Sequence, residues 1–115
     1  MISDVFCKII NGELKTDFVY KDEDFIVIKD INPQAPVHLL LVPVKHFFDI
    51  HAMIEADSGL FEKAFKVADK VAHEVGLTEK GYRLIINEGE DGGKLVPHFH
   101  MHILGGKRLG PKIVK

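Results

Sequence analysis

Residues 98–104, HFHMHIL, carry the strongest pattern in this chain. Successive side chains of a β-strand point to opposite faces, so the pattern predicts three histidines on one face and apolar side chains on the other. Neighbouring imidazoles would then stand about 6.5–7 Å apart along the strand. We therefore expect a strand at residues 97–104 that packs on a core through one face and presents a row of imidazoles on the other.

Three interpretations fit such a row. The first is an amphipathic strand with solvent-facing imidazoles, although nothing physical favours histidine three times over Thr or Lys. The second is a metal site with a further ligand such as His38, but the outer pair, about 13 Å apart, cannot reach one ion together. The third is covalent catalysis, because a neutral imidazole attacks phosphorus when one ring nitrogen is free and the other is held by a hydrogen bond.

Composition sets the wider limits. The 115 residues predict a single domain spanning residues 1–115, too short for a two-half nucleotide fold or a full barrel. Fifteen basic and 17 acidic side chains give a net charge of −2, so we expect no nucleic-acid partner and no membrane surface as partner. Seven histidines against one cysteine point to histidine as the carrier of function.

The N-terminal residues and the cysteine content predict a cytoplasmic protein. Cys7 is the only cysteine, so no intrachain disulfide can form. Residues 1–10 lack the basic and long apolar regions of a signal peptide, and no run approaches the roughly 18 apolar residues of a membrane span. We expect Cys7 to be a small core residue, because nothing nearby in the sequence would lower its pKa.

Apolar periodicity predicts an α+β fold with a five-stranded, mostly antiparallel sheet and one main helix. Ser3 or Asp4 would cap a short helix that ends at Ile10. A continuously apolar run at residues 25–28 predicts a strand covered on both faces. The five strands are expected at residues 17–21, 25–29, 37–43, 82–87 and 97–104.

The main helix is predicted at residues 58–75, with Asp57 or Ser58 as its N-cap and Gly76 after its end. Its opposite face is charged, as on a solvated helix surface. The apolar stripe is wide enough either to be buried within one chain or to leave surface for a partner. That stripe comprises Leu60, Phe61, Ala64, Phe65, Val67, Ala68, Val71, Ala72 and Val75.

Two further segments are predicted to be irregular. Residues 88–94, EGEDGGK, form a glycine-rich loop that lacks the pattern of a Walker phosphate loop. Residues 105–115 carry four basic side chains among Gly and Pro, and we expect a loosely ordered C-terminal tail there.

Several segments, in order, resemble the histidine triad (HIT) family, in its branch of Hint-type purine nucleoside phosphoramidases. HFHMHIL fits the family pattern His-φ-His-φ-His-φ-φ. The resemblance covers nearly the whole chain and implies a sheet that continues across a homodimer. The other matching segments are FCKII at 6–10, DINPQAPVH at 30–38, LVPVKH at 41–46, NEG at 87–89 and DGG at 91–93.

The resemblance also implies a reaction, the hydrolysis of nucleoside phosphoramidates or acyl-nucleotides, with AMP-type purine substrates and no required metal or other cofactor. His100 would attack the α-phosphorus and form a nucleotidyl-histidine. The backbone carbonyl of His98 would hold the other ring nitrogen of His100, and the His98 side chain would link toward His38. His102 would donate to a phosphoryl or leaving-group oxygen.

The nucleotide site is likewise implied by the resemblance. Asp30 would accept the ribose hydroxyls, as suits a carboxylate beside two donors. From spacing alone, Asn87 and the glycines after it fit a strand end and a turn. The residues implied for the apolar base slot are Val5, Phe6, Ile9, Ile28 and Ile31. The residues implied for the phosphate are Asn87, Gly93, Lys94 and Leu95.

Residue 95 departs from the family pattern. The family commonly has Ser or Glu at the position of Leu95 and Gln at that of Lys94. Leu95 has no hydrogen-bond donor, so we expect the leaving group to receive less acid assistance, with Lys94 as a mobile cation beside the phosphates in partial compensation. The three remaining histidines, His46, His51 and His73, are predicted to be structural.

Alternative functions stay open at this point. One keeps the fold but makes the protein a nucleotide-binding or regulatory partner with weak activity. Another is a dinucleoside polyphosphate hydrolase or nucleotidyl transferase of the same superfamily. The last is a metal-binding protein that uses the histidine row.

Overall fold

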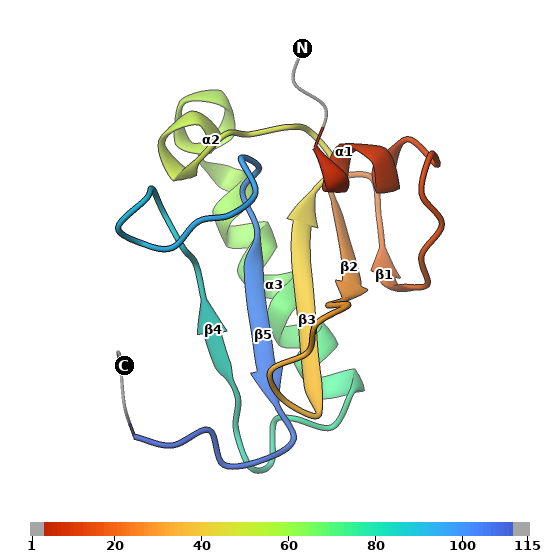
Figure 1. Ribbon diagram of the computed structural model, residues 1–115, viewed down its shortest axis with the longest axis vertical. Coiled ribbons are helices and arrows are strands. Elements are labelled where there is room, and N and C mark those ends of the chain that lie inside the picture. Colours follow the sequence, from red (N-terminus) through yellow and green to blue (C-terminus); the bar gives the residue numbers. More distant parts are fainter. Residues whose placement is uncertain (1–3, 112–115) are drawn as a thin grey trace.

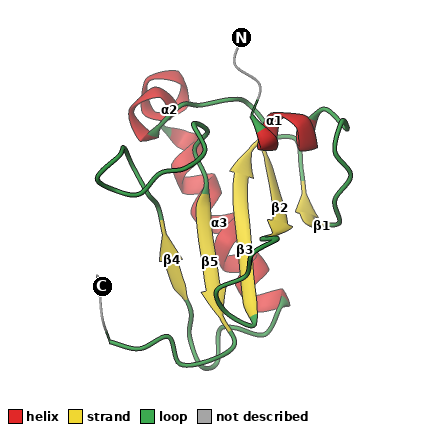
Figure 2. Ribbon diagram, viewed as in Figure 1, coloured by secondary structure: helices red, strands yellow, loops and turns green. Residues whose placement is uncertain are grey.

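The computed structural model describes residues 4–111 and arranges them as a sheet with helices on both of its faces (Figure 1, Figure 2). The strands follow the order β1-β2-β3-β5-β4, and every neighbouring pair is antiparallel. The predicted α+β fold with a five-stranded antiparallel sheet is therefore confirmed. Its elements are α1 (Val5–Ile10), β1 (Phe18–Lys21), β2 (Phe25–Lys29), β3 (Val37–Pro43), α2 (Ile50–Asp57), α3 (Gly59–Glu74), β4 (Arg83–Ile85) and β5 (Met101–Gly105).

The two faces of the sheet bury different sets of side chains. On one face, Phe25 and Val27 of β2 join a core that includes Met101 and Ile103 and the apolar side of α3, which lies behind the sheet in Figure 1. On the other face, Ile26 and Ile28 pack with Phe6 of α1. The expectation that residues 25–28 are covered on both faces is confirmed, because alternate side chains of a strand enter opposite layers.

The long helix α3 is close to its predicted span, but it differs in two details. Ser58 precedes it without a capping hydrogen bond from its side chain. Phe65, which belongs to the predicted apolar stripe, is 50% exposed, because small side chains form the buried side of the helix. Gly76 follows the helix at φ +79°, as expected for a residue that ends a helix in the left-handed region. The buried side chains are Ala64, Val67, Ala68, Val71 and Ala72.

A second helix, α2, was not predicted. It starts where the Asp49 side chain accepts a hydrogen bond from the Ala52 N–H at 2.8 Å. Its apolar residues Ile50, Met53 and Ile54 make one short i, i+3, i+4 match, which is too brief for a periodicity over 11–18 residues to show, and only Met53 is buried. Its position is set by the cap and by packing next to α3 rather than by periodicity (Figure 1).

The last strand is shorter than predicted, and this is the correction that matters most for the site. The strand β5 begins at Met101, which pairs with Leu41, so continuing the register would set Phe99 opposite Pro43. Pro43 has no N–H to donate to this ladder. Phe99 instead donates its N–H to the carbonyl of Phe47 at 2.7 Å, and His98 and His100 lie outside the strand. The two outer strands predicted at residues 17–21 and 82–87 are also shorter, at Phe18–Lys21 and Arg83–Ile85.

The chain ends agree with the predictions in part. Asp4 caps α1 by accepting from the Cys7 N–H at 2.8 Å, whereas Ser3 lies outside the described residues. Gly105 belongs to β5 and not to a loose tail, and Arg83 donates to the Gly110 carbonyl at 2.7 Å, so this part of the tail is tied to β4. Residues 112–115 lie outside the described residues.

Within residues 4–111, no helix has the length and apolar character that a membrane crossing requires. The predicted cytoplasmic location and the assignment of the whole chain to one domain stay predictions.

Candidate active site

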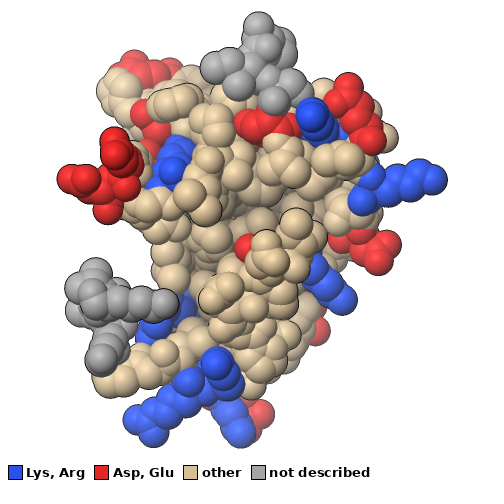
Figure 3. All heavy atoms as spheres, viewed as in Figure 1, with Lys and Arg blue, Asp and Glu red and all other residues tan. Residues whose placement is uncertain are grey.

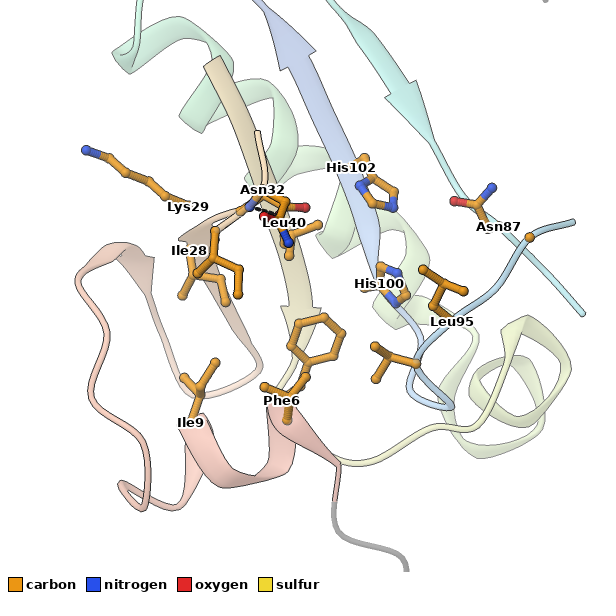
Figure 4. A pocket seen from close by; sticks show the side chains of 15 residues that line it. Phe6, Ile9, Ile28, Lys29, Asn32, Leu40, Asn87, Leu95, His100 and His102 are labelled. Carbon is orange, nitrogen blue, oxygen red and sulfur yellow. Dashed lines mark hydrogen bonds between the residues drawn. The ribbon is translucent and has the colours of Figure 1, made fainter. Parts of the chain in front are cut away.

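A cavity of about 430 Å³ lies on the face of the sheet opposite α3 (Figure 4). Figure 3 shows this face as mostly uncharged, with most charged side chains at its edges and a small acidic spot near its middle. The cavity thus combines an apolar interior with a few polar groups, the usual character of a small-molecule site. Its walls are Val5, Phe6, Ile9, Ile28, Lys29, Asp30, Ile31, Asn32, Leu40, Asn87, Gly93, Leu95, Val96, His100 and His102.

One half of the cavity is apolar. The helix α1 supplies Val5, Phe6 and Ile9, and β2 supplies Ile28. The Phe6 ring lies 5.1 Å from the His100 ring, centroid to centroid, so the apolar half reaches the imidazole directly. Ile31 stands at the rim and is 91% exposed. An apolar slot that ends at an imidazole suits a flat, weakly polar ring next to a reacting group.

His100 is held with one ring nitrogen occupied and the other free. Its Nδ1 lies 2.8 Å from the backbone carbonyl of His98, so this nitrogen carries the proton and donates. In the neutral ring Nε2 is then unprotonated. The residue is buried but borders the cavity, which leaves this nitrogen as the atom available to a ligand.

His102 belongs to a chain of hydrogen bonds with His38. His38 accepts from the Gln34 N–H at Nδ1 (3.1 Å), so its proton sits on Nε2, which lies 2.9 Å from His102 Nδ1. The same Nε2 is 3.4 Å from a carboxylate oxygen of Asp30. His102 therefore accepts at Nδ1 and carries its own proton on Nε2.

Burial, together with the neighbouring His100 and His38, lowers the pKa of His102 to about 4. An imidazole with such a pKa is neutral at pH 7. His102 can therefore offer its Nε2–H as a hydrogen-bond donor without adding a full charge to the cavity.

The side chain of His98 points away from this cavity. Its Nε2 lies 3.1 Å from the Pro43 carbonyl, and its Nδ1 lies 3.2 Å from Asp4 Oδ2 and 3.7 Å from the Cys7 sulfur. The predicted link from His98 to His38 is wrong, because His38 is engaged by His102. The early departure from the β5 ladder turns His98 toward α1 and so separates it from the other two histidines of the motif.

His46, predicted to be structural, joins the same group. Its Nε2 lies 3.1 Å from Asp4 Oδ2, and its ring packs edge-on against that of His98 at 4.7 Å. Burial lowers the pKa of His98 and raises that of Cys7. Burial also acts to raise the pKa of Asp4, but the Cys7 N–H and the two imidazoles outweigh it, so the pKa of Asp4 is lowered. Asp4 is thus a buried anion held by a helix cap and two rings.

Two groups of described residues have donor atoms close enough to hold a metal ion. Within each group, the donor atoms all lie within 4.8 Å of one another. One group is Asp4, Cys7, His46 and His98, and the other is Asp30, His38 and His102. The first offers the nitrogen, sulfur and carboxylate donors that zinc takes. His98 and His102 fall in different groups, in line with the expectation that the three histidines cannot converge on one ion. That no cofactor is required stays a prediction.

The loop between β4 and β5 closes the polar side of the cavity. Asn87 donates to the Gly92 carbonyl at 2.7 Å and so holds the loop in a tight turn. Gly93 and Leu95 border the cavity, but the Lys94 side chain does not. The Lys94 ammonium donates to the Phe48 carbonyl and lies 3.7 Å from Glu88, so it is not the mobile cation beside the cavity that we expected.

Some wall residues were not predicted. Leu40 stands two residues after His38 on β3 and therefore shares its face, a relation that the period of two could have revealed. Lys29, Asn32 and Val96 carry no such signal. Asp4 and His46 could not be linked to His98 from the sequence, since the three residues come from distant parts of the chain.

The HFHMHIL motif, with its middle histidine at the end of an apolar cavity in an α+β fold, is typical of histidine triad proteins, and comparison with known sequences agrees. The family model of the HIT domain matches residues 11–109, so the chain belongs to the HIT family. The purine nucleoside phosphoramidase of Escherichia coli K12 is 42% identical over 112 residues, covering 95% of this chain and 92% of that protein. An uncharacterised HIT-like protein of Chlamydia muridarum is 47% identical over 106 residues, covering 92% of this chain and 83% of the relative.

Solved structures are similar over the same length. A HIT family hydrolase from Clostridium thermocellum has a TM-score of 0.91 at 48% identity, covering 96% of both chains. A histidine triad protein from Clostridium difficile has a TM-score of 0.91 at 38% identity, covering 97% of both chains. The fold and the family are therefore established together.

Proposed function

We propose that this protein is a hydrolase that cleaves nucleoside phosphoramidates or acyl-nucleotides, with purine nucleotides of the AMP type, through a covalent nucleotidyl-histidine on His100. The observation that carries the proposal is the 2.8 Å contact between His100 Nδ1 and the His98 carbonyl, which leaves Nε2 free at the cavity. The similarity to a purine nucleoside phosphoramidase supports the substrate class.

The nucleophilic step follows from this tautomer. As Nε2 bonds to the α-phosphorus, the imidazole gains positive charge, and its Nδ1–H is already directed at a carbonyl dipole that stabilises that charge. The bond from phosphorus to the leaving nitrogen or oxygen breaks as the new bond forms. Water then attacks the nucleotidyl-histidine, releases the nucleoside monophosphate and restores the neutral ring.

His102 and His38 stabilise the phosphoryl group in this proposal. The Nε2–H of His102 donates to a phosphoryl oxygen as negative charge develops, while His38 holds the opposite nitrogen at 2.9 Å. Because the pKa of His102 is about 4, it acts as a neutral donor. Asn87 and the backbone at Gly93 border the same side of the cavity, where phosphate oxygens would lie.

The other half of the cavity receives the nucleoside. The base lies in the slot of Phe6, Ile9 and Ile28, and Asp30 accepts hydrogen bonds from the ribose hydroxyls. One oxygen of Asp30 already accepts from the Asn32 N–H at 2.8 Å, which fixes the carboxylate at the cavity edge. Leu95 has no donor, so the leaving group takes its proton from solvent at the open side of the cavity.

We also propose that two copies of the chain associate, as the family resemblance implies. Phe65 of α3 is half exposed, and β4 pairs with β5 alone within the described residues. An unpaired edge strand and an exposed aromatic side chain are each features that a second copy can cover. Sedimentation at several protein concentrations tests this, and a monomer at every concentration would refute it.

The central experiment is incubation with adenosine 5′-phosphoramidate, followed by rapid quenching and mass spectrometry under mildly basic conditions. We expect an adenylylated peptide containing residue 100 and release of AMP. His100→Ala should form neither. Turnover by His100→Ala at the wild-type rate would refute the assignment of the nucleophile.

The same assay separates the alternatives. Tight AMP binding without any turnover would identify a nucleotide-binding or regulatory protein. Preference for dinucleoside polyphosphates would place the protein with the hydrolases of that class. Activity that is lost with a chelator and restored by zinc would show a required metal, whereas we expect the activity to persist without one.

A further inference from the structure

Leu95 connects the nucleotide cavity to a second hollow. The second hollow is also about 430 Å³ in volume, and Gly93 and Leu95 border both spaces. Figure 4 shows Leu95 beside His100, on the opposite side of the cavity from Ile9 and Ile28. With the base in the apolar slot, the group that leaves the phosphorus would therefore pass across Leu95. The second hollow is lined by Phe48, Asp49, Glu88, Gly89, Glu90, Gly93, Lys94, Leu95 and Pro97.

The exposed side chains along this path are large and apolar. Leu95 is 92% exposed and Phe48 is 55% exposed. Val5 and Ile31 add two further exposed apolar side chains at the rim of the first cavity. Half of the large apolar side chains that are exposed in residues 4–111 thus border these two spaces. Apolar side chains gathered at a cavity mouth mark a surface that a ligand or partner covers.

The charged side chains around the second hollow are mainly acidic. Asp49, Glu88 and Glu90 line it, and the exposed Asp91 is adjacent in the chain. Figure 3 shows acidic side chains at the edge of the face where this loop lies. Lys94 is the only cation among its described lining residues. Its side chain is 7% exposed and lies against Glu88 and the Phe48 carbonyl, so it compensates Glu88 and leaves Asp49 and Glu90 without a cation among the described lining residues.

We propose that the second hollow binds the leaving group, and that the substrate is a nucleoside phosphoramidate whose amine carries an apolar, preferably aromatic, side group and no negative charge. This inference rests on the proposed function and adds the leaving-group class to it. The Lys94 ammonium lies over the Phe48 ring at 5.3 Å from its centroid, and the exposed remainder of that half-exposed ring is the aromatic surface for the amine's side group. Leu95 covers the stem of the amine. The carboxylates oppose a carboxylate or a further phosphate on the leaving group.

Leu95 then has a role of its own in place of a polar residue, which is apolar contact with the leaving group. A leucine cannot assist the departing amine with a proton, but it offers an isobutyl surface within reach of the first atoms of the leaving group. Binding energy between remote apolar groups and the enzyme contributes to specificity even where it adds no acid catalysis. Leu95 and Phe48 are therefore specificity-determining residues in this scheme, and neither is a catalytic residue.

The test uses three adenosine phosphoramidates, made from propylamine, 2-phenylethylamine and phenylalanine, with the unsubstituted phosphoramidate as reference. We expect kcat/KM for the phenylethyl compound to exceed that for the propyl compound by about tenfold, mainly through KM, as for apolar groups in partly open pockets. The carboxylate of the phenylalanine compound should lower kcat/KM by about twofold to fivefold relative to phenylethyl. This penalty should shrink as salt is added.

Substitutions test whether the preference among amines arises at the second hollow. Phe48→Ala and Leu95→Ala should each lower the phenylethyl-to-propyl ratio toward one, and Phe48→Leu should retain part of it. Glu90→Lys should remove most of the carboxylate penalty. Phe18→Ala and Leu14→Ala change exposed apolar side chains outside both spaces and should keep the wild-type ratio.

The outcomes are distinguishable. Equal kcat/KM for all three amines, with the unsubstituted compound still cleaved, would overturn this inference and leave the proposed function intact. An undiminished preference in both Phe48→Ala and Leu95→Ala would overturn the assignment of the hollow. Failure to cleave any of the four compounds would overturn the proposed function itself.

Discussion

The three histidines of one short motif divide between two groups of histidines with opposite surroundings. His100 and His102 border the cavity, and His38 lies behind His102, with its Nε2 2.9 Å from His102 Nδ1. His98, with His46, lies against Asp4 and has no exposed side-chain surface. One sequence pattern thus places imidazoles in two environments, at the cavity and in an enclosed group behind it.

The main chain joins the two groups. The carbonyl of His98 receives the Nδ1–H of His100, while the His98 side chain is fixed by Pro43 and Asp4. The buried group therefore sets the position of the carbonyl that determines which nitrogen of His100 is free. Substitutions in the open group should act on the chemistry, and substitutions in the buried group should act first on stability.

The largest effect should come from His100. His100→Ala removes the nucleophile, and we expect kcat for adenosine phosphoramidate to fall by at least about a thousandfold. The loss of stability should be smaller than in His98→Ala, because the space left by His100 opens onto the cavity. Steady-state kinetics and chemical denaturation measure the two quantities. His51→Ala is the matched control, because the His51 side chain is 80% exposed and remote from the cavity walls. A fall of less than tenfold in His100→Ala would contradict the role of His100.

His102 should have the second-largest effect on rate. His102→Ala removes a donor to the phosphoryl oxygens, and the loss of one such donor costs about a hundredfold or more in kcat. His38→Ala should act through His102 and therefore cost less. If His38→Ala proved more harmful to kcat than His102→Ala, the order of the hydrogen-bond chain would be wrong.

A substitution in the buried group of His98, His46 and Asp4 should lower the free energy of unfolding. His98→Ala leaves a void and an unpaired Pro43 carbonyl, so we expect a loss of about 2–4 kcal/mol in the free energy of unfolding. Urea denaturation followed by circular dichroism measures this loss. An unchanged unfolding midpoint would mean that the Asp4 group is not an anchor.

The smallest effect concerns pH. The pKa of His102 is about 4 in the folded protein, below the ordinary value of 6.5, so the unfolded chain binds this proton first as pH falls. The contribution of His102 to stability should be complete above pH 6.5 and should decline as pH falls toward 4. NMR titration should find the imidazole neutral at pH 5, and a His102 pKa near 6.5 would contradict the prediction.

Sequence patterns predicted much of this architecture for identifiable reasons. The strands β2 and β3 have the predicted bounds, because continuous apolar runs bounded by turn residues are direct signals of buried strands. The helix α3 is nearly as predicted because its two faces differ in polarity. The helix α2 was missed, since its start depends on the cap at Asp49 and only one of its residues is buried.

The sequence by itself determined the sheet, the long helix, the family and the presence of a row of imidazoles, since these depend on local periodicity and on a contiguous motif. Only the tertiary structure decided which imidazole faces the cavity and which is enclosed. That outcome depends on Pro43, which offers no N–H where β5 would otherwise extend, and on Asp4, which reaches His98 across 94 positions of chain. Contacts between residues so far apart leave no periodic signal in a single sequence.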